Sequence, residues 1–206
     1  DATDIEARDG YSTVTIGLKY FLFENSDLDG DLLPNDEEEA LGTNPYDADT
    51  DGDGLSDYEE TRVCHTSPTL KDTDGDGLND YVETAKYRSN PLAADTDADG
   101  LFDTDEVLTL KTNPLAADTD ADGLADAEEG TLGTNPREAD TDRDNLTDMD
   151  ELRKYHSNPL VADSDGDGLS DYEEVFSYGS NALLPDTDGD ALSDFDEVTV
   201  HHSDPL

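Results

Sequence analysis

Apolar side chains recur in short groups along most of the chain. Leu169, Tyr172 and Val175 form one such group, and the same spacing of three residues recurs in neighbouring groups. This spacing predicts about two turns of helix with one narrow apolar stripe. Dipeptides such as Asn90-Pro91 separate the groups, and the residue before a proline is disfavoured in helical backbone. The pattern therefore predicts a unit made of a loop, a short helix and a turn.

The N-terminal segment, residues 1–26, follows a different pattern. Residues 13–23 alternate apolar and polar side chains, so that Val14 and Ile16 share one face and Thr15 lies on the other. Such alternation predicts a β-strand. A lone strand is unstable and must pair with a partner. Three partners stay open: a preceding β-domain such as a surface sandwich, an outer-membrane β-barrel that this strand closes, and a neighbouring subunit that receives the strand.

A tandem repeat accounts for residues 27–206. The segments 49–60 and 163–174 read DTDGDGLSDYEE and DSDGDGLSDYEE, and related copies lie between and around them. Eight copies follow one another at spacings of 22, 23, 23, 23, 22, 23 and 23 residues, and they are numbered here repeats 1 to 8. Loop position 1 is the first aspartate of each copy. These aspartates are Asp27, Asp49, Asp72, Asp95, Asp118, Asp140, Asp163 and Asp186.

Negative charge is concentrated in these repeats. The chain has 56 acidic and 11 basic residues and a formal net charge of -45. Of the 56 acidic residues, 46 lie at loop positions 1, 3, 5, 9, 11 and 12. A merely solvated acidic surface would scatter its carboxylates and mix Asp with Glu, whereas Asp holds positions 1, 3 and 5 and Glu holds position 12 in every copy. The fixed positions of the acids therefore predict that the repeats bind a metal ion.

Composition excludes several classes of protein. Leu, Ile, Val and Phe make up only about 19% of the residues, which is too little for a self-sufficient hydrophobic core. The charge excludes nucleic-acid binding, and no apolar run is long enough for membrane insertion by the repeats. The lone Cys64 cannot form an intramolecular disulfide. Because the chain begins at Asp1 without an initiator methionine, we expect a mature chain or a fragment.

The repeat pattern D-x-D-x-D-G-L-x-D-x-x-E matches a calcium loop. Ca²⁺ takes 6 to 8 oxygen ligands from alternate Asp side chains, a backbone carbonyl at position 7 and a bidentate Glu at position 12. The predicted ligands at position 1 are the eight aspartates given above. Those at position 3 are Asp29, Asp51, Asp74, Asp97, Asp120, Asp142, Asp165 and Asp188, and those at position 5 are Asp31, Asp53, Asp76, Asp99, Asp122, Asp144, Asp167 and Asp190.

The remaining predicted ligands lie in the second half of the pattern. Position 7 supplies the carbonyls of Leu33, Leu55, Leu78, Leu101, Leu124, Leu146, Leu169 and Leu192, whose side chains are predicted to face inward. Position 9 supplies Asn35, Asp57, Asp80, Asp103, Asp126, Asp148, Asp171 and Asp194. Position 12 supplies Glu38, Glu60, Glu83, Glu106, Glu129, Glu151, Glu174 and Glu197.

Position 6 is predicted to need left-handed backbone, which explains its glycines. Leu32 and Ala191 break this rule at a cost of about 1–2 kcal/mol each, and Asn145 tolerates the conformation better. We therefore expect weaker sites in the first and last copies. Arg143 brings a positive charge into the sixth loop, so a weaker site is expected there as well.

One to two calcium ions per repeat are predicted. Eight Ca²⁺ ions would reduce the net charge from -45 to -29 and sixteen would reduce it to -13, which a soluble domain tolerates better. The second ion would bridge the loop acids and the following turn. Mg²⁺ fits less well because it demands near-octahedral geometry and keeps its waters. Only about 11 residues separate one loop from the next, so an EF-hand with two full helices has no room.

These residues resemble the thrombospondin type 3 repeats, most closely their bacterial form. The typical text of that family reads like residues 163–174 followed by Asn-Pro, and the match recurs eight times over about 180 residues. The resemblance implies a solenoid-like repeat fold of mostly irregular loops and short helices wrapped around calcium ions, about two per repeat. The animal forms carry paired cysteines that this chain lacks. The family often serves as a spacer, so no catalysis is implied.

The predicted function is a calcium-binding structural stalk or spacer that calcium rigidifies. We expect it outside the cell or on the cell surface, including the bacterial outer surface or periplasm, where calcium is plentiful. The alternatives are a calcium-dependent adhesion or self-assembly module, with the N-terminal strand donated to a neighbouring subunit or domain, and a spacer within a larger secreted enzyme. No nucleophile and base stand near the four histidines, so we expect no enzymatic activity in these residues.

Overall fold

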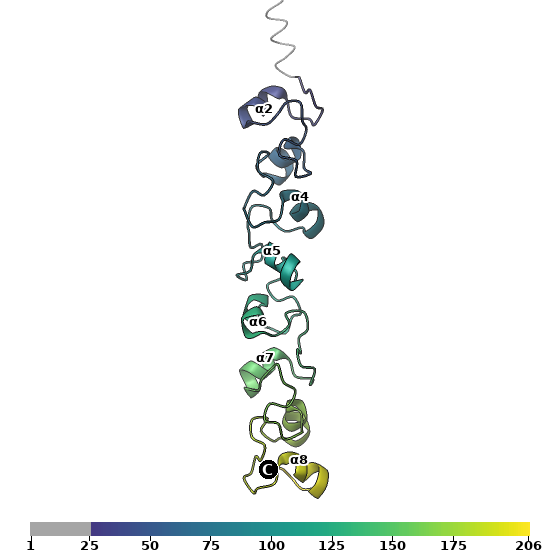
Figure 1. Cartoon of the computed structure of the whole chain (residues 1–206), viewed down its shortest axis with the longest axis vertical. Helices are drawn as coiled ribbons and strands as arrows, with labels where there is room; N and C mark the ends of the chain where they lie inside the picture. The colour runs from purple at the N-terminus through teal and green to yellow at the C-terminus, as the bar shows by residue number, and fades with distance from the viewer. Residues whose placement is uncertain (1–25) are drawn as a thin grey trace, which may run out of the picture. The chain divides into compact units, whose positions relative to one another are not determined.

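The computed structural model describes residues 26–206, drawn as a series of short helices and loops (Figure 1). The chain divides into two compact units, one ending at Ala94 and the other spanning Asp95–Leu206. Unit 1 contains repeats 1 to 3, and unit 2 contains repeats 4 to 8. The strand predicted over residues 13–23 lies outside the described residues, so it and the boundary at residue 26 stay predictions.

Each repeat is a loop, a short helix and a turn, as the sequence predicts. The helices of unit 1 are α2 (Asn35–Leu41), α3 (Asp57–Glu59), η1 (Glu60–Cys64), α4 (Asp80–Val82) and η2 (Glu83–Tyr87). Those of unit 2 are α5 (Asp103–Asp105), η3 (Glu106–Leu110), α6 (Asp126–Leu132), α7 (Asp148–Asp150), η4 (Glu151–Tyr155), η5 (Glu173–Tyr178), α8 (Asp194–Asp196) and η6 (Glu197–His201). Residues 26–206 contain no β-strand.

Helix type follows repeat length. Repeats 1 and 5 have the 22-residue spacing, and their helices α2 and α6 are α-helical throughout. At the end of α6 the amide of Gly133 donates to the carbonyl of Glu129, four residues earlier, at 2.8 Å. The 23-residue repeats continue into a π-helical turn, where the amide of Lys111 donates to the carbonyl of Glu106, five residues earlier, at 2.7 Å. The additional residue is therefore accommodated in the helix, and both kinds of helix end on the carbonyl of the position 12 glutamate.

Local sequence explains where the helices begin. Ser56 accepts a bond from the amide of Glu59, whose side chain bonds back to the Ser56 amide in a capping box. Asn79, Thr147 and Ser193 cap the helices of repeats 3, 6 and 8 in the same position. Acidic residues fill the first turns, where negative charge complements the helix dipole. The loop acids are thus placed at helix N-termini by capping that the sequence encodes locally.

Acidic side chains dominate the buried residues. The glutamates at position 12 are 0% exposed in repeats 1 to 7 and 3% exposed in repeat 8, and the aspartates at position 9 are 0% exposed in repeats 2 to 8. The predicted inward position of the leucines at position 7 is confirmed for six of them, while Leu101 and Leu192 are half-buried. The buried hydrophobic residues of the described chain are Leu33, Leu55, Leu78, Val107, Leu124, Leu146, Leu169 and Ala182.

Consecutive repeats of a unit are in contact through loop position 10. In unit 2 the side chain of Met149 lies against the loop of the preceding repeat, where a Cβ added to Gly123 would be 3.4 Å from the Met149 Cγ. Phe195 lies against Gly168 in the same way, because a Cβ added to Gly168 would be 3.2 Å from the Phe195 Cδ2. Position 6 therefore favours glycine for close packing as well as for its backbone conformation. No helix within residues 26–206 is both long and apolar enough to span a bilayer.

Candidate metal centre

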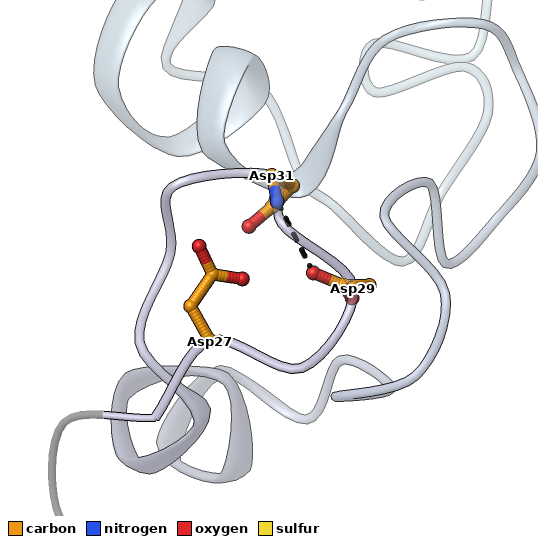
Figure 2. Close-up of side chains that lie close together, drawn as sticks. All are labelled: Asp27, Asp29 and Asp31. Carbon is orange, nitrogen blue, oxygen red and sulfur yellow. Dashed lines mark hydrogen bonds between the residues drawn. The ribbon is translucent and has the colours of Figure 1, made fainter.

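Three carboxylates converge in the loop of each repeat. In repeats 1 to 5 the nearest carboxylate oxygens of positions 1, 3 and 5 lie within 4.8 Å of one another, and three more groups of this kind occur among the described residues. Figure 2 shows repeat 1, where Asp27, Asp29 and Asp31 turn toward the inside of the loop. Like charges at such distances repel one another, so the arrangement calls for a compensating positive charge.

The backbone of the loop holds the position 1 carboxylate in place. In repeat 5, Asp118 accepts bonds from the amide of Ala121 at 2.7 Å and from the amide of Gly123 at 3.0 Å. Both amides can reach it because both residues have left-handed backbone, with φ of 66° and 109°. The two bonds recur in all eight loops, so the sequence of each loop folds around its first aspartate.

The carboxylates at positions 3 and 5 are oriented by the next amides of the loop. Asp120 Oδ1 accepts the amide of Asp122 at 3.2 Å, and Asp122 Oδ1 accepts the amide of Leu124 at 2.7 Å. These bonds fix one oxygen of each carboxylate, and both carboxylates have an oxygen within 4.8 Å of one on Asp118. The same bonds occur in the other seven repeats.

In most repeats, two buried carboxylate oxygens lack a hydrogen-bond partner. They are Oδ2 at position 3 and Oε2 at position 12. An unpaired buried polar group costs about 1–3 kcal/mol, and buried charges are normally paired or bound to a metal. The loops therefore fit a cation with hard oxygen ligands. The unpartnered oxygens belong to Asp29, Asp51, Asp97, Asp120, Asp142, Asp165, Glu38, Glu60, Glu106, Glu129, Glu151, Glu174 and Glu197.

The pKa values of these groups reflect the same lack of compensation. Burial raises the pKa of Glu60 to about 9 and that of Glu129 to about 8, with repulsion from the aspartates at positions 3 and 5 as the next cause. Burial likewise raises the pKa of Asp142 and of Asp165 to about 6. Without a cation, the buried glutamates would retain protons near neutral pH. A divalent cation in the loop would replace those protons.

A hydroxyl residue supports the glutamate at position 12. Ser157 donates its hydroxyl to Glu151 Oε1 at 3.0 Å, and the equivalent Thr or Ser does so in repeats 2 to 5, 7 and 8. In repeat 1 the hydroxyl of Thr43 bonds instead to the carbonyl of Glu38. The sequence pattern predicted only a turn in this region, although a Thr or Ser recurs at this place in every copy.

The aspartates at position 9 have partners for both oxygens. Asp126 accepts the amide of Thr119 at 2.8 Å and its hydroxyl at 2.7 Å, and the same pair of bonds occurs in repeats 2 to 8, with Ser164 in repeat 7. Repeat 1 has Asn35 and Leu28 at these positions and keeps only the amide bond, at 3.1 Å. Position 9 therefore closes the loop, and its predicted ligand role stays a prediction. The hydroxyl at position 2 was missed, although it recurs in seven copies.

The prediction of left-handed backbone at position 6 is confirmed, including where glycine is absent. The φ angles are 86° at Leu32, 86° at Asn145 and 81° at Ala191. Position 4 is left-handed as well, with φ of 65° at Ala98 and 67° at Arg143, which the sequence analysis did not anticipate. The signal for position 4 was its glycine in five copies.

The side chain of Arg143 is paired with a glutamate of the preceding turn. It is 74% exposed, and its guanidinium donates to Glu138 at 3.0 and 2.8 Å. Because the guanidinium is paired with Glu138, the weaker sixth site expected from its charge stays a prediction. The geometry of the sixth loop matches that of the others.

Loop, helix and buried carboxylates together define a class of proteins, the arrays of short acidic repeats whose interiors are built from charged groups in place of an apolar core. Within that class, the chain belongs to the family of the bacterial TSP3 repeat, as the resemblance predicted. The family matches residues 27–48, 49–69, 72–94, 95–117, 118–136, 163–185 and 186–206. These segments correspond to repeats 1 to 5, 7 and 8, and repeat 6 has the same loop bonds.

Similar solved structures cover only small parts of the chain. A biofilm associated protein, B domain, is 42% identical over 22% of this chain and 11% of its own, with a TM-score of 0.22. A biofilm associated protein, BSP domain, is 43% identical over 21% of this chain and 8% of its own, with a TM-score of 0.21. The matches thus span about a tenth of the length of those proteins. No curated protein matches this chain significantly.

Proposed function

We propose that the eight loops bind calcium and that the bound ions take the place of a hydrophobic core. One observation carries this proposal: the unpartnered buried oxygens at positions 3 and 12, which recur from repeat to repeat. The position 3 side chain belongs to the cluster of carboxylates at positions 1, 3 and 5, and the position 12 glutamate is close enough to feel repulsion from positions 3 and 5. An all-oxygen donor set of this kind suits Ca²⁺, and Mg²⁺ would demand a stricter geometry.

The same loop positions would hold the ion in every repeat. Using repeat 5 as the example, the side chains of Asp118, Asp120, Asp122 and Glu129 would hold the ion, with the carbonyl of Leu124 as a further ligand. When bound, Ca²⁺ supplies two positive charges to a group of buried anions. The amides of the loop keep the carboxylates in place, and the helix brings the glutamate to them.

The function that follows is structural. A chain with few apolar residues and a formal charge of -45 gains its order from the ions, so it would be rigid with calcium and expanded without it. Millimolar calcium is found outside cells, which favours a stalk or spacer on a cell surface or in a secreted protein. The described residues would then separate or present other parts of a longer protein and would carry out no reaction of their own.

Small-angle X-ray scattering with circular dichroism tests this function. The chain is measured in 5 mM calcium, in 5 mM magnesium and in excess chelator at one ionic strength. We expect a larger radius of gyration and loss of helical signal in chelator, with magnesium restoring much less order than calcium. Calorimetric titration should give 8 to 16 bound calcium ions, at one to two per repeat. Equal scattering curves and no binding heat in calcium and chelator would refute the proposal.

A further inference from the structure

The carboxylate at position 5 is shared between two repeats. Its Oδ1 accepts an amide of its own loop, and its Oδ2 accepts the backbone amide at position 10 of the next repeat. In unit 2 these bonds join Asp99 to Ala127 at 3.2 Å, Asp122 to Met149 at 3.0 Å, Asp144 to Tyr172 at 2.8 Å and Asp167 to Phe195 at 2.7 Å. In unit 1 they join Asp31 to Tyr58 at 2.9 Å and Asp53 to Tyr81 at 2.9 Å.

The donor amide at position 10 lies in the first turn of a helix. Met149 is the second residue of α7, where backbone amides have no acceptor within their own helix. The carboxylate of Asp122 therefore supplies an acceptor that the helix itself cannot provide. A negative charge at this end also complements the helix dipole. In these six pairs, the helix of the later repeat is thus capped in part by a predicted ion ligand of the repeat before it.

The side chain at position 10 reinforces this contact. Met149 covers the preceding loop at Gly123, and Leu124 beneath it is 0% exposed. Where position 10 is the small Ala127, no atom lies within 4 Å of a Cβ placed on Gly100, and Leu101 is half-buried. The next repeat therefore closes the loop of the previous one by its amide and, where the side chain is large, by packing.

All six bonds run in one direction. The predicted ligand always belongs to the repeat nearer the N-terminus, and the donor always belongs to the repeat that follows. Repeat 6 also bonds to the turn of repeat 5, where Thr141 Oγ1 accepts the amide of Asn135. This bond uses none of the carboxylates at positions 1, 3, 5 or 12. The contacts between neighbours are therefore asymmetric with respect to the ion.

We propose that the loops of one unit are coupled with a fixed polarity, so that an ion in one loop orders the helix of the repeat on its C-terminal side. This inference rests on the proposed calcium binding. An ion fixes the position 5 carboxylate in its bonding position against the repulsion of its neighbours. When the loop is empty, the carboxylate is released and the amide at position 10 of the next repeat loses its acceptor. The helix of the same repeat keeps its cap, because that cap comes from the loop before.

Amide hydrogen exchange on the full chain, followed by NMR in calcium, tests the polarity. Asp120→Asn weakens the fifth loop without changing a side chain in the bond between repeats. The amide of Met149 should then exchange about tenfold or more faster, because it loses a bond to a charged acceptor, while the amides of Ala127 and Phe195 should change less than twofold. The matched control is Asp105→Asn, which removes one charge at an exposed position 11 and should leave all three amides unchanged.

A second variant keeps the outcome decisive if the first loosens the whole unit. Asp97→Asn weakens the fourth loop, so the amide of Ala127 should exchange faster and that of Met149 should not. If either variant accelerates the amides on both sides equally, or accelerates Phe195 as well, the polarity is wrong. If calcium and chelator give equal exchange at all three amides of the unmodified chain, calcium binding itself is refuted. The two failures are therefore distinguishable.

Discussion

Thr141 donates both its backbone amide and its hydroxyl to the carboxylate of Asp148, at 2.9 and 2.7 Å. The carboxylate is 0% exposed, so these two bonds take the place of its lost water. The pair closes the sixth loop by joining its second residue to the first residue of α7. The hydroxyl also accepts the amide of Asn135 from the preceding turn, at 2.8 Å. A single side chain thus links a turn, a loop and a helix.

Replacing this hydroxyl should weaken the sixth repeat. Thr141→Val keeps the shape of the side chain and leaves Asp148 Oδ2 and the amide of Asn135 without a partner. Loss of about 1–3 kcal/mol in the free energy of unfolding is expected, measured by urea denaturation in calcium. The control is Thr109→Val, since Thr109 is exposed and its side chain makes no described hydrogen bond. A change no larger than that of the control would contradict the loop-closing role.

Two adjacent glutamates of repeat 5 should behave very differently. Glu129 is fully buried with an unpartnered Oε2, whereas its neighbour Glu128 is exposed and forms an ion pair with Arg153. Glu129→Gln should remove one to two calcium ions from the calorimetric stoichiometry. Glu128→Gln should leave the stoichiometry unchanged and cost less than about 1 kcal/mol, because exposed ion pairs contribute little. Equal stoichiometry in the two variants would show that the ligand assignment at position 12 is wrong.

Relieving backbone strain should strengthen the last repeat. Ala191 has a φ of 81°, where glycine is favoured over any residue with a Cβ. Ala191→Gly should therefore raise the free energy of unfolding in calcium by about 1 kcal/mol. Ala116→Gly is the matched control, because Ala116 does not have a positive φ and the same change should destabilise there. The strain argument does not survive if the two substitutions shift the urea midpoint in the same direction.

Acid should favour the calcium-free fold and oppose the calcium-bound one. In the folded chain without ions the pKa of Glu60 is raised from the ordinary 4.5 to about 9 and that of Glu129 to about 8. The folded state then binds more protons than the unfolded state between about pH 4.5 and 9, so its stability rises as the pH falls through that window. In chelator, the helical signal at pH 5 should exceed that at pH 8.

Calcium reverses this dependence, because protons and the ion compete for the same oxygens. In saturating calcium the urea midpoint should be higher at pH 8 than at pH 5. The measurement is circular dichroism at both pH values, with and without chelator, at fixed ionic strength. Midpoints that move in the same direction with pH in both conditions would contradict the assignment of these glutamates as ion ligands.

Much of the repeat could be predicted because its constraints are local. The period places Leu124 inside its loop, the glycine pattern gives left-handed backbone at Gly123, and the spacing of the acids brings Asp118 and Asp120 together. The contacts between copies could not be predicted in this way. A period says that copies are alike, but it does not say that the amide of Met149 meets a carboxylate of the copy before it.

The hydroxyl residues escaped prediction for another reason. Thr141 and Ser157 recur from copy to copy, but Thr and Ser are also common in ordinary turns, so their recurrence alone does not reveal their partners. Their true partners are buried carboxylates, Asp148 and Glu151. Repeat 1 contained the decisive signal, because it lacks both the hydroxyl at position 2 and the carboxylate at position 9.

The change between α-helical and π-helical repeats has a consequence for how such an array can vary. Both helix types end on the carbonyl of the position 12 glutamate, so a codon can be gained or lost just after Glu129 or Glu106 without displacing a loop carboxylate. Copies produced by duplication can therefore drift in length, one by one, while their loops stay interchangeable. A one-residue deletion between positions 1 and 9 cannot be accommodated in this way, because it would separate the amides from the carboxylates that they orient.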